Sequence, residues 1–173
     1  AEANNNSVTV SGDSKVKNIY GGEAEAIGDQ TATAKANGNS VTVSGSTVNG
    51  TFGIYGGEAY IKGNGDQTAT AEANNNSVTV SNGSTTNGIY GGYASAEGNQ
   101  TAAAEANNNS VTVSDHSTVD EDIRGGRAYV EGNQTAAAEA NNNSVTVSGS
   151  TVNDDSYGIY GGYAYARGNQ TAA

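Results

Sequence analysis

The sequence contains no cysteine, proline, methionine, tryptophan or leucine, and Phe52 is its only phenylalanine. Without cysteine there are no disulfides and no thiolate metal sites, and neither redox compartment is favoured. The lack of leucine argues against a helical bundle, because long flexible apolar side chains fill the interfaces between helices. No apolar run approaches the roughly 20 residues that span a bilayer, so we expect no membrane insertion.

Basic residues are also scarce. Seven Lys and Arg stand against 18 Asp and Glu, which gives a net charge of −11 at pH 7. A chain of this charge repels phosphate backbones, so we do not expect nucleic acid as a partner. The first residue is Ala1 rather than Met, so we expect a processed product or an excerpt of a longer chain, and no targeting segment is recognisable.

The sequence consists of one unit repeated five times. The string Ser-Val-Thr-Val begins at spacings of 33, 37, 33 and 34 residues, at Ser7, Ser40, Ser77, Ser110 and Ser144. A Gly-Gly pair and a Gln-Thr-Ala tripeptide also recur in every unit, and no linker interrupts the series. Residues 1–173 therefore form a single repeat array with a period of roughly 34 residues.

The two ends of the sequence match each other. When the C-terminal end is joined to the N-terminal end, the combined sequence matches that of an internal unit. Residues 1–6 of a next copy would therefore complete the last unit. We therefore expect either a window from a longer array or separate chains that meet end to end. Neither end carries a polar cap or a charged, proline-bearing edge of the kind that stops strand addition.

Each unit alternates small or apolar residues with polar ones, which is the period of a half-buried β-strand. In the unit around residue 100 we place these side chains inside: Ala94, Ala96, Ala102, Ala104, Ala106, Val111 and Val113. The alternation changes phase at Gly91-Gly92 and again at 107–109. We interpret both places as corners or bulges, since Gly and Asn tolerate positive φ.

This pattern predicts an all-β fold, a β-solenoid of five rungs with about three short strands per rung and an interior of Ala, Val and Ile. Tandem antiparallel hairpins, with Gly98-Asn99 as a tight turn, are the alternative. Three strands is an odd number, so an up-and-down meander would reverse successive units, whereas all five units look alike. A fourth strand at 46–48 would weaken this preference.

In a stacked array each column of side chains repeats every ~4.8 Å. We expect amide ladders at the Asn triplets, beginning with Asn4, Asn5 and Asn6, and an internal ladder of Gln30, Gln67, Gln100, Gln134 and Gln170. The Tyr20, Tyr55, Tyr90 and Tyr160 column is interrupted by Arg124, whose guanidinium we expect to stack between rings. An outward column of Glu2, Glu72, Glu105 and Glu139 is interrupted by Lys35.

The unit resembles a known kind of repeat. The run from Asn141 through Asn153, followed by 158–164 (Gly-Ile-Tyr-Gly-Gly-Tyr-Ala), is similar to the β-strand repeats of large bacterial cell-surface proteins, namely autotransporter passengers and haemagglutinin-like adhesins. The resemblance covers essentially the whole chain. It implies export, a β-solenoid fold and an extracellular structural or adhesive role on a bacterial surface.

Few residues suggest chemistry. His116 is the only histidine and lies in a variable loop, without the positioned partners that nucleophilic catalysis needs. The acids Asp120, Glu121, Asp122, Asp154 and Asp155 offer oxygen ligands suited to Ca²⁺, but the Gly-Gly-x-Gly-x-Asp calcium repeat is absent. We expect no enzyme activity and no cofactor, with Ca²⁺ as the one open possibility.

Our main functional expectation is a structural protein, a protomer or segment of an extracellular β-solenoid filament whose partner is itself through uncapped terminal rungs. A monomeric stalk or adhesin is the alternative, in which Tyr93, Tyr129, Tyr163 and Tyr165 contact glycans or a host surface. A minor alternative is an ice-binding protein, because Thr9, Thr42, Thr79, Thr112 and Thr146 form an outward column. An enzyme acting on polysaccharide is the last alternative. Its catalytic residues should be unique to one rung, whereas the candidate acids here recur.

Overall fold

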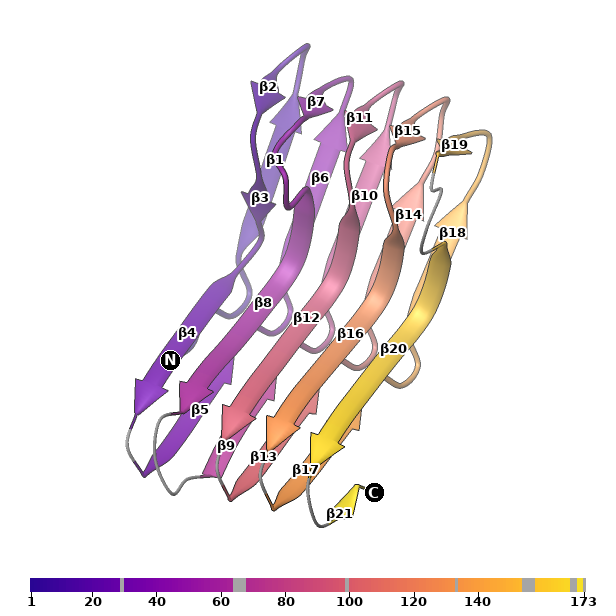
Figure 1. Cartoon of the computed structure of the whole chain (residues 1–173). Helices are drawn as coiled ribbons and strands as arrows, with labels where there is room; N and C mark the ends of the chain where they lie inside the picture. The colour runs from indigo at the N-terminus through magenta and orange to yellow at the C-terminus, as the bar shows by residue number, and fades with distance from the viewer. Residues whose placement is uncertain are drawn as a thin grey trace.

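The computed structural model describes residues 1–28, 30–63, 68–98, 100–132, 134–153, 158–168 and 171–172. Within these residues every regular element is a β-strand, and equivalent strands of successive units pair in parallel. The fold is a β-solenoid of about 4 turns, with its strands stacked in order along one axis (Figure 1). The hairpin alternative is wrong, because strand pairing joins residues one unit apart, as in Ser7 with Ser40.

Four parallel sheets run along the solenoid, and each unit contributes to all of them. The Ser sheet contains β1 (Ser7–Ser11), β6 (Ser40–Ser44), β10 (Ser77–Ser81), β14 (Ser110–Val113) and β18 (Ser144–Val147). The short sheet contains β2 (Lys15–Val16), β7 (Thr47–Val48), β11 (Thr85–Thr86), β15 (Thr118–Val119) and β19 (Thr151–Val152).

The other two sheets complete each turn. The long sheet contains β3 (Ile19–Tyr20), β4 (Glu23–Gly28), β8 (Ile54–Gly63), β12 (Ile89–Gly98), β16 (Ile123–Gly132) and β20 (Ile159–Gly168). The Ala sheet contains β5 (Thr31–Lys35), β9 (Thr68–Glu72), β13 (Thr101–Glu105), β17 (Thr135–Glu139) and β21 (Thr171–Ala172). The prediction of three short strands per rung is corrected to four, of which the one in the long sheet reaches 10 residues.

The interior divides into two lobes. The valine lobe lies between the Ser sheet, the short sheet and the first residues of the long strands, and is filled by side chains such as Val41, Val43 and Ile54. The alanine lobe lies between the rest of the long strands and the Ala sheet, and its buried apolar side chains among the described residues are all Ala apart from Ile61 and Val130. All seven side chains that the alternation placed inside are at most 1% exposed.

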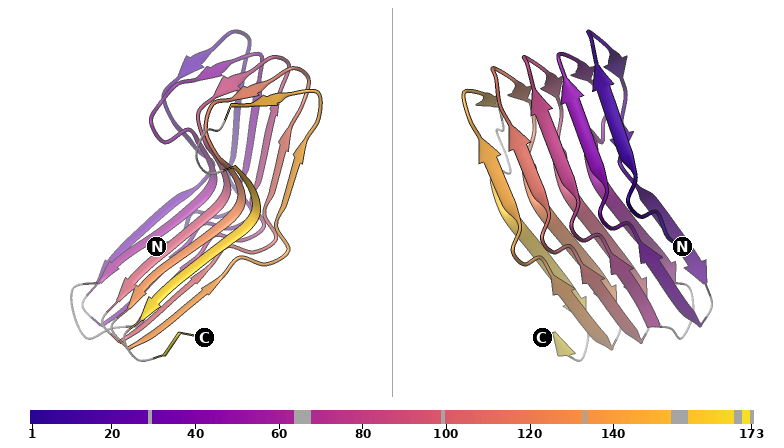
Figure 2. Two further views of the ribbon diagram at one scale, coloured as in Figure 1. Left: turned by 45° about the vertical axis from the view of Figure 1, so that its right-hand side comes forward. Right: turned by 180° about the vertical axis from the view of Figure 1, so that it is seen from behind.

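Each long strand bends where it passes from one lobe to the other, which gives every turn an elbow (Figure 2). In β12 the bend falls at Gly91–Gly92, where the pattern of buried residues changes phase. These glycines have no positive φ, so the reason we gave for Gly at this corner is wrong. A Cβ on Gly91 would lie 2.3 Å from the carbonyl oxygen of Gly125, and one on Gly92 would lie 2.3 Å from that of Ala73. Glycine is needed because backbones approach closely here.

Candidate functional site

The Asn triplets face the Gly-Gly bends and form, with them, the waist between the two lobes. We call residues 4–6, 37–39, 74–76, 107–109 and 141–143 the Asn corners. The middle residue of the corner has positive φ in each turn, 60° at Asn5 and Asn75 and 68° at Gly38. Asn and Gly are the residues that adopt this conformation most readily. Gly38 therefore replaces Asn in the second unit at the one corner position that requires this backbone.

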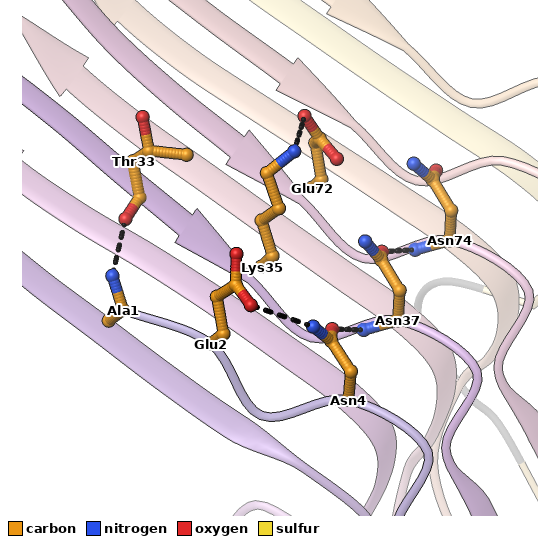
Figure 3. A network of polar contacts seen from close by, with 8 residues as sticks. All are labelled: Ala1, Glu2, Asn4, Thr33, Lys35, Asn37, Glu72 and Asn74. Carbon is orange, nitrogen blue, oxygen red and sulfur yellow. Dashed lines mark hydrogen bonds and ion pairs between the residues drawn. The ribbon is translucent and has the colours of Figure 1, made fainter.

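The first Asn of each corner bonds toward the following turn. Asn4 Oδ1 accepts a hydrogen bond of 2.9 Å from the backbone N–H of Asn37, and Asn37 Oδ1 accepts one of 2.7 Å from Asn74 (Figure 3). The same contact recurs from Asn107 to Asn74 and from Asn141 to Asn107. Each side chain thus satisfies a backbone donor that the sheet ladders leave unpaired.

The third Asn bonds in the opposite axial direction and is buried. Asn39 Oδ1 accepts from the backbone N–H of Asn6 at 2.9 Å and from Asn6 Nδ2 at 3.0 Å. The same pair of bonds joins Asn39 to Asn76, Asn76 to Asn109 and Asn109 to Asn143, while Asn39, Asn76 and Asn109 are each 1% exposed. A buried amide with its partners in register fixes how one turn sits on the next.

A serine column that the sequence analysis missed does the same work at the far edge of the valine lobe. The Ser46 N–H donates to Ser84 Oγ, that of Ser84 to Ser117 Oγ and that of Ser117 to Ser150 Oγ, at 3.2–3.3 Å. Ser46, Ser84 and Ser117 are at most 4% exposed. The signal was present in the sequence, since a Ser precedes every strand of the short sheet.

The prediction of an internal ladder of Gln side chains is wrong for the Gln residues that the structure describes. Gln30, Gln100 and Gln134 are exposed, and Gln67 and Gln170 lie outside the described residues. Gln100 comes just before β13, at the turn between two strands. Alternation assigns a face only within a continuous strand, so its phase relative to Ala102 does not place Gln100 inside.

The tyrosine column forms as predicted. Tyr20 and Tyr55 stack with ring centroids 5.2 Å apart, and Tyr55 and Tyr90 with centroids 4.8 Å apart. Arg124 takes the next place, with Cζ 5.6 Å from the ring centroids of both Tyr90 and Tyr160. Its Nε also lies 2.7 Å from Asp122 Oδ2, and both side chains of this ion pair are under 10% exposed.

This ion pair corrects part of the calcium prediction. Asp122 is buried against Arg124 and also accepts hydrogen bonds from Tyr90 Oη, so its carboxylate is already neutralised. Asp120 accepts from Asn153 Nδ2 at 3.0 Å, Glu121 is exposed, and Asp154 and Asp155 lie outside the described residues. Within the part of the chain that the structure describes, no three His, Cys, Asp or Glu side chains gather as a metal site.

The outward acidic column is in register as expected. The backbone of Glu2 forms an isolated β-bridge with that of Lys35, and Lys35 lies in register with Glu72. Glu105 and Glu139 follow Glu72 on successive strands. Lys35 Nζ lies 3.0 Å from Glu72 Oε1, which satisfies one acid (Figure 3). Glu105 and Glu139 lie side by side without an intervening cation, so like charges meet toward the C-terminal end of this column.

A groove of about 480 Å³ opens beside the first residues of the long strands, and we call it the tyrosine groove. Five of its lining residues are aromatic: Tyr20, Phe52, Tyr55, Tyr90 and Tyr93. Four are charged: Glu23, Glu58, Glu121 and Arg127. Groove residues come from four successive turns, because Tyr20, Tyr55 and Tyr90 occupy equivalent positions in three of them and Glu121 and Arg127 belong to the next.

Charges in the groove are unevenly distributed. Burial, together with the nearby carboxylates of Glu23 and Glu25, raises the pKa of Glu58 to about 7. The described residues give the Glu58 side chain no hydrogen bond and no ion pair. Burial is also the main cause that raises the pKa of the Tyr55 and Tyr90 hydroxyls. The groove is therefore rich in aromatic surface and poor in compensating positive charge.

His116 lies in an exposed turn with φ of 62°. The part of the chain that the structure describes contains no apolar helix long enough to cross a membrane. Comparison with models of known protein families, with curated proteins and with solved structures finds no match to this chain.

Proposed function

We propose that the chain is a non-enzymatic structural protein, a segment of an extracellular filament. The filament extends along the solenoid axis by adding further turns with the same repeat sequence. One observation carries this proposal. The first and last turns present the two unfilled halves of the hydrogen-bond pattern that joins every pair of turns between them. The next turn can belong to the same polypeptide or to a second copy, because the contact is the same in both cases.

The matching halves can be followed at the Asn corner. Inside the array, the N–H of the middle residue donates to the carbonyl of the first Asn one turn on, as in Asn75 to Asn107 and Asn108 to Asn141. Among the described residues, the Asn142 N–H has no such acceptor and the Asn4 carbonyl has no such donor. A second copy placed in register beyond the last turn supplies this missing partner.

The Asn side chains repeat this complementarity. In the interior, Oδ1 of a third Asn accepts from the third Asn of the preceding turn, but the described residues contain no such donor for Asn6 Oδ1. The N–H of Asn143 similarly lacks the Oδ1 acceptor that serves Asn39, Asn76 and Asn109. Donor and acceptor thus lie on opposite ends of the stack, which favours head-to-tail addition over a symmetric dimer.

The last turn also exposes the apolar interior. Ile54, Ile89 and Ile123 are fully buried, whereas the equivalent Ile159 is 50% exposed and its neighbour Tyr160 is 38% exposed. Burial of apolar surface therefore acts together with the hydrogen bonds when a further turn is added. Open strand edges of this kind are the usual starting point for strand addition.

Assembly of the 173-residue chain tests the proposal. We expect negative-stain images at neutral pH to show filaments as wide as one solenoid, and sedimentation to show polymers that grow with protein concentration. Compact particles of one size at every concentration would contradict axial assembly.

The acidic column supplies a register-specific version of this test. In head-to-tail stacking, Glu139 of one copy lies beside Glu2 of the next. Glu139→Lys should lower the critical concentration by up to about fivefold, since an exposed pair is worth up to about 1 kcal/mol. Adding Glu2→Lys should reverse the gain, because two lysines then meet. Glu105→Lys is the control, since Glu105 lies inside the column and away from either end. A double variant that assembles as well as Glu139→Lys would rule out this register.

The non-enzymatic character rests on repetition. Candidate acids such as Glu72, Glu105 and Glu139 recur in one column on successive turns. A catalytic residue should instead be unique to one turn. The bacterial cell-surface location rests on the resemblance of the repeat text. Protease shaving of intact producing cells tests it, because a surface protein is lost and an internal one is retained.

An adhesin segment is the second candidate function. Tyr129 and Tyr165 stack with centroids 5.2 Å apart at 9°, and Tyr165 remains 37% exposed, which gives a flat aromatic surface suited to a sugar ring. Glycan-array binding that is lost in Tyr165→Ala while filaments persist would favour this function. The ice-binding alternative has less support, because Thr9 and Thr33 lie on separate sheets and do not form a double threonine array.

A further inference from the structure

The tyrosine groove lies on the side of a single solenoid and is formed by residues of the first four units. Its function is therefore independent of axial assembly. Three carboxylates, those of Glu23, Glu58 and Glu121, line it against the single guanidinium of Arg127. A cation is attracted to this groove and an anion is repelled.

The chain itself shows which cation the neighbouring surface accepts. In the fourth unit Arg124 occupies the position held by Tyr55 and Tyr90 in earlier units, and its Cζ lies 5.6 Å from the ring centroid of Tyr90. Arg127 occupies the position held by Glu58 and Tyr93, and its Cζ lies 5.1 Å from the ring centroid of Tyr93. A guanidinium packs well against aromatic side chains in both columns.

The first two units have the same columns without the cations. Tyr20 and Tyr55 occupy one column, and Glu23 and Glu58 occupy the other. Where Arg124 has the carboxylate of Asp122 beside it, the Glu58 carboxylate has no hydrogen bond or ion pair among the described residues. This part of the groove thus holds the aromatic and anionic halves of an interaction whose cationic half is present two turns away.

We propose that the tyrosine groove binds a guanidinium cation, carried either by a small molecule or by an arginine side chain of an extended peptide. The carboxylates of Glu23 and Glu58 accept its N–H hydrogen bonds. The aromatic walls, which include the 57% exposed Phe52, contact the alkyl chain that carries the guanidinium. A planar guanidinium matches a carboxylate better than an ammonium does, because its donors form a fixed fork.

A matched pair of ligands tests the charge requirement on the unmodified chain. N-acetyl-arginine amide and N-acetyl-citrulline amide have nearly the same shape, but only the first is charged. Titration calorimetry should show saturable binding of the arginine compound and at least about tenfold weaker binding of the citrulline compound, since a charge-assisted hydrogen bond contributes about 1.5–3 kcal/mol. Equal binding of the two compounds, or no saturation by the arginine compound at tens of millimolar, would overturn the proposal.

Variants then locate the site. Glu58→Gln and Glu23→Gln should each weaken binding of the arginine compound by about tenfold. Glu58→Gln is expected to fold, because the carboxyl is already partly buried without a partner. Glu97→Gln is the control, because it removes the same charge from the same sheet outside the groove and should leave the affinity unchanged. Equal affinity in Glu58→Gln and the unmodified chain would place the cation elsewhere and refute the proposal.

Two further ligands separate the possible sources. Agmatine represents a free small molecule, and the peptide Gly-Arg-Gly represents an arginine within a chain. Tighter binding of either one supports the proposal and assigns the source. A neutral methyl glycoside that saturates the groove, with loss in Glu58→Gln and no competition from the arginine compound, would assign the groove to a sugar and overturn the guanidinium assignment.

Discussion

The two lobes of each turn share the same strand register but contain different side chains. The valine lobe is filled by β-branched residues that recur in every unit, such as Val41, Val78 and Val111. The alanine lobe is filled by methyl groups, and only one of its columns varies, from Ala26 to Ile61, Ala96 and Val130. Side-chain volume therefore differs between lobes while the strand register is common, which shows that register here is fixed elsewhere.

The waist between the lobes is where register is fixed. Backbones approach closely at the Gly-Gly bends, and the buried Asn of each corner joins adjacent turns through its side chain. A column of similar apolar side chains stays buried when one turn slides along the next. An amide that loses its partner in this way leaves a buried polar group unsatisfied. Substitutions at the waist should therefore have larger effects than substitutions in either lobe.

The largest expected effect is from Gly92→Val. Its Cβ would lie 2.3 Å from the carbonyl oxygen of Ala73 and 2.5 Å from Asn109 Nδ2, and neither the backbone nor the buried amide can move away. We expect global loss of structure, seen as loss of the β signal in circular dichroism at 25 °C. Gly83→Ala is the control, because a Cβ there meets nothing within 4 Å, so it should cost only the strain of a positive φ. A folded Gly92→Val protein would show that the waist is not closely packed.

The next largest effect is from Asn109→Ala. It removes the acceptor used by the Asn76 N–H and Nδ2 and leaves these buried donors unpaired, which should destabilise the fold by about 3–5 kcal/mol. Asn108→Gly is the matched control in the same corner, since its φ of 57° suits glycine and its side chain is exposed. Urea denaturation of both variants measures the difference. Equal midpoints would contradict the role that we assign to the buried amide.

Exchanging side-chain size between lobes should have an intermediate effect. Val80→Ala opens a cavity in the valine lobe and Ala104→Val overfills the alanine lobe, and both side chains are fully buried. We expect each to cost roughly 2 kcal/mol in urea denaturation. The comparison between lobes fails if Ala104→Val is neutral, because the alanine lobe would then have room for a larger residue.

The smallest effect concerns the pH dependence that Glu58 adds. The pKa of Glu58 is about 7 in the folded chain, above its ordinary value of 4.5, so folding favours the protonated form. This group therefore leaves stability unaffected below about pH 4.5 and lowers it as pH rises through 7. Glu58→Gln should raise the melting temperature by a few degrees at pH 8 and leave it unchanged at pH 4. A gain of the same size at both pH values would contradict the assigned pKa.

Much of the fold is readable from the sequence because the repeat is strict. Alternation placed the seven Ala and Val side chains between Ala94 and Val113 correctly, and the shared register followed from five similar units. The sequence raised a fourth strand at 46–48, which the structure confirms as β7, but two residues are too few for a period to establish it. Gln100 was misplaced because it lies outside the strand that begins at Thr101. The Asp122–Arg124 pair and the tyrosine groove depend on how the residues before each long strand sit against its first residues, which alternation does not specify.

The opposed directions of the two Asn columns have a consequence for any longer stack. Because the first Asn bonds forward and the third Asn bonds backward, each tip of the described stack offers both a free amide oxygen and a free N–H, but from different corner positions. These groups are Asn6 Oδ1 and the Asn4 N–H at one tip, and Asn141 Oδ1 and the Asn143 N–H at the other. Subunits arriving at the two tips meet different chemistry, so elongation should be faster at one tip than at the other, and seeds marked at one tip should grow asymmetrically.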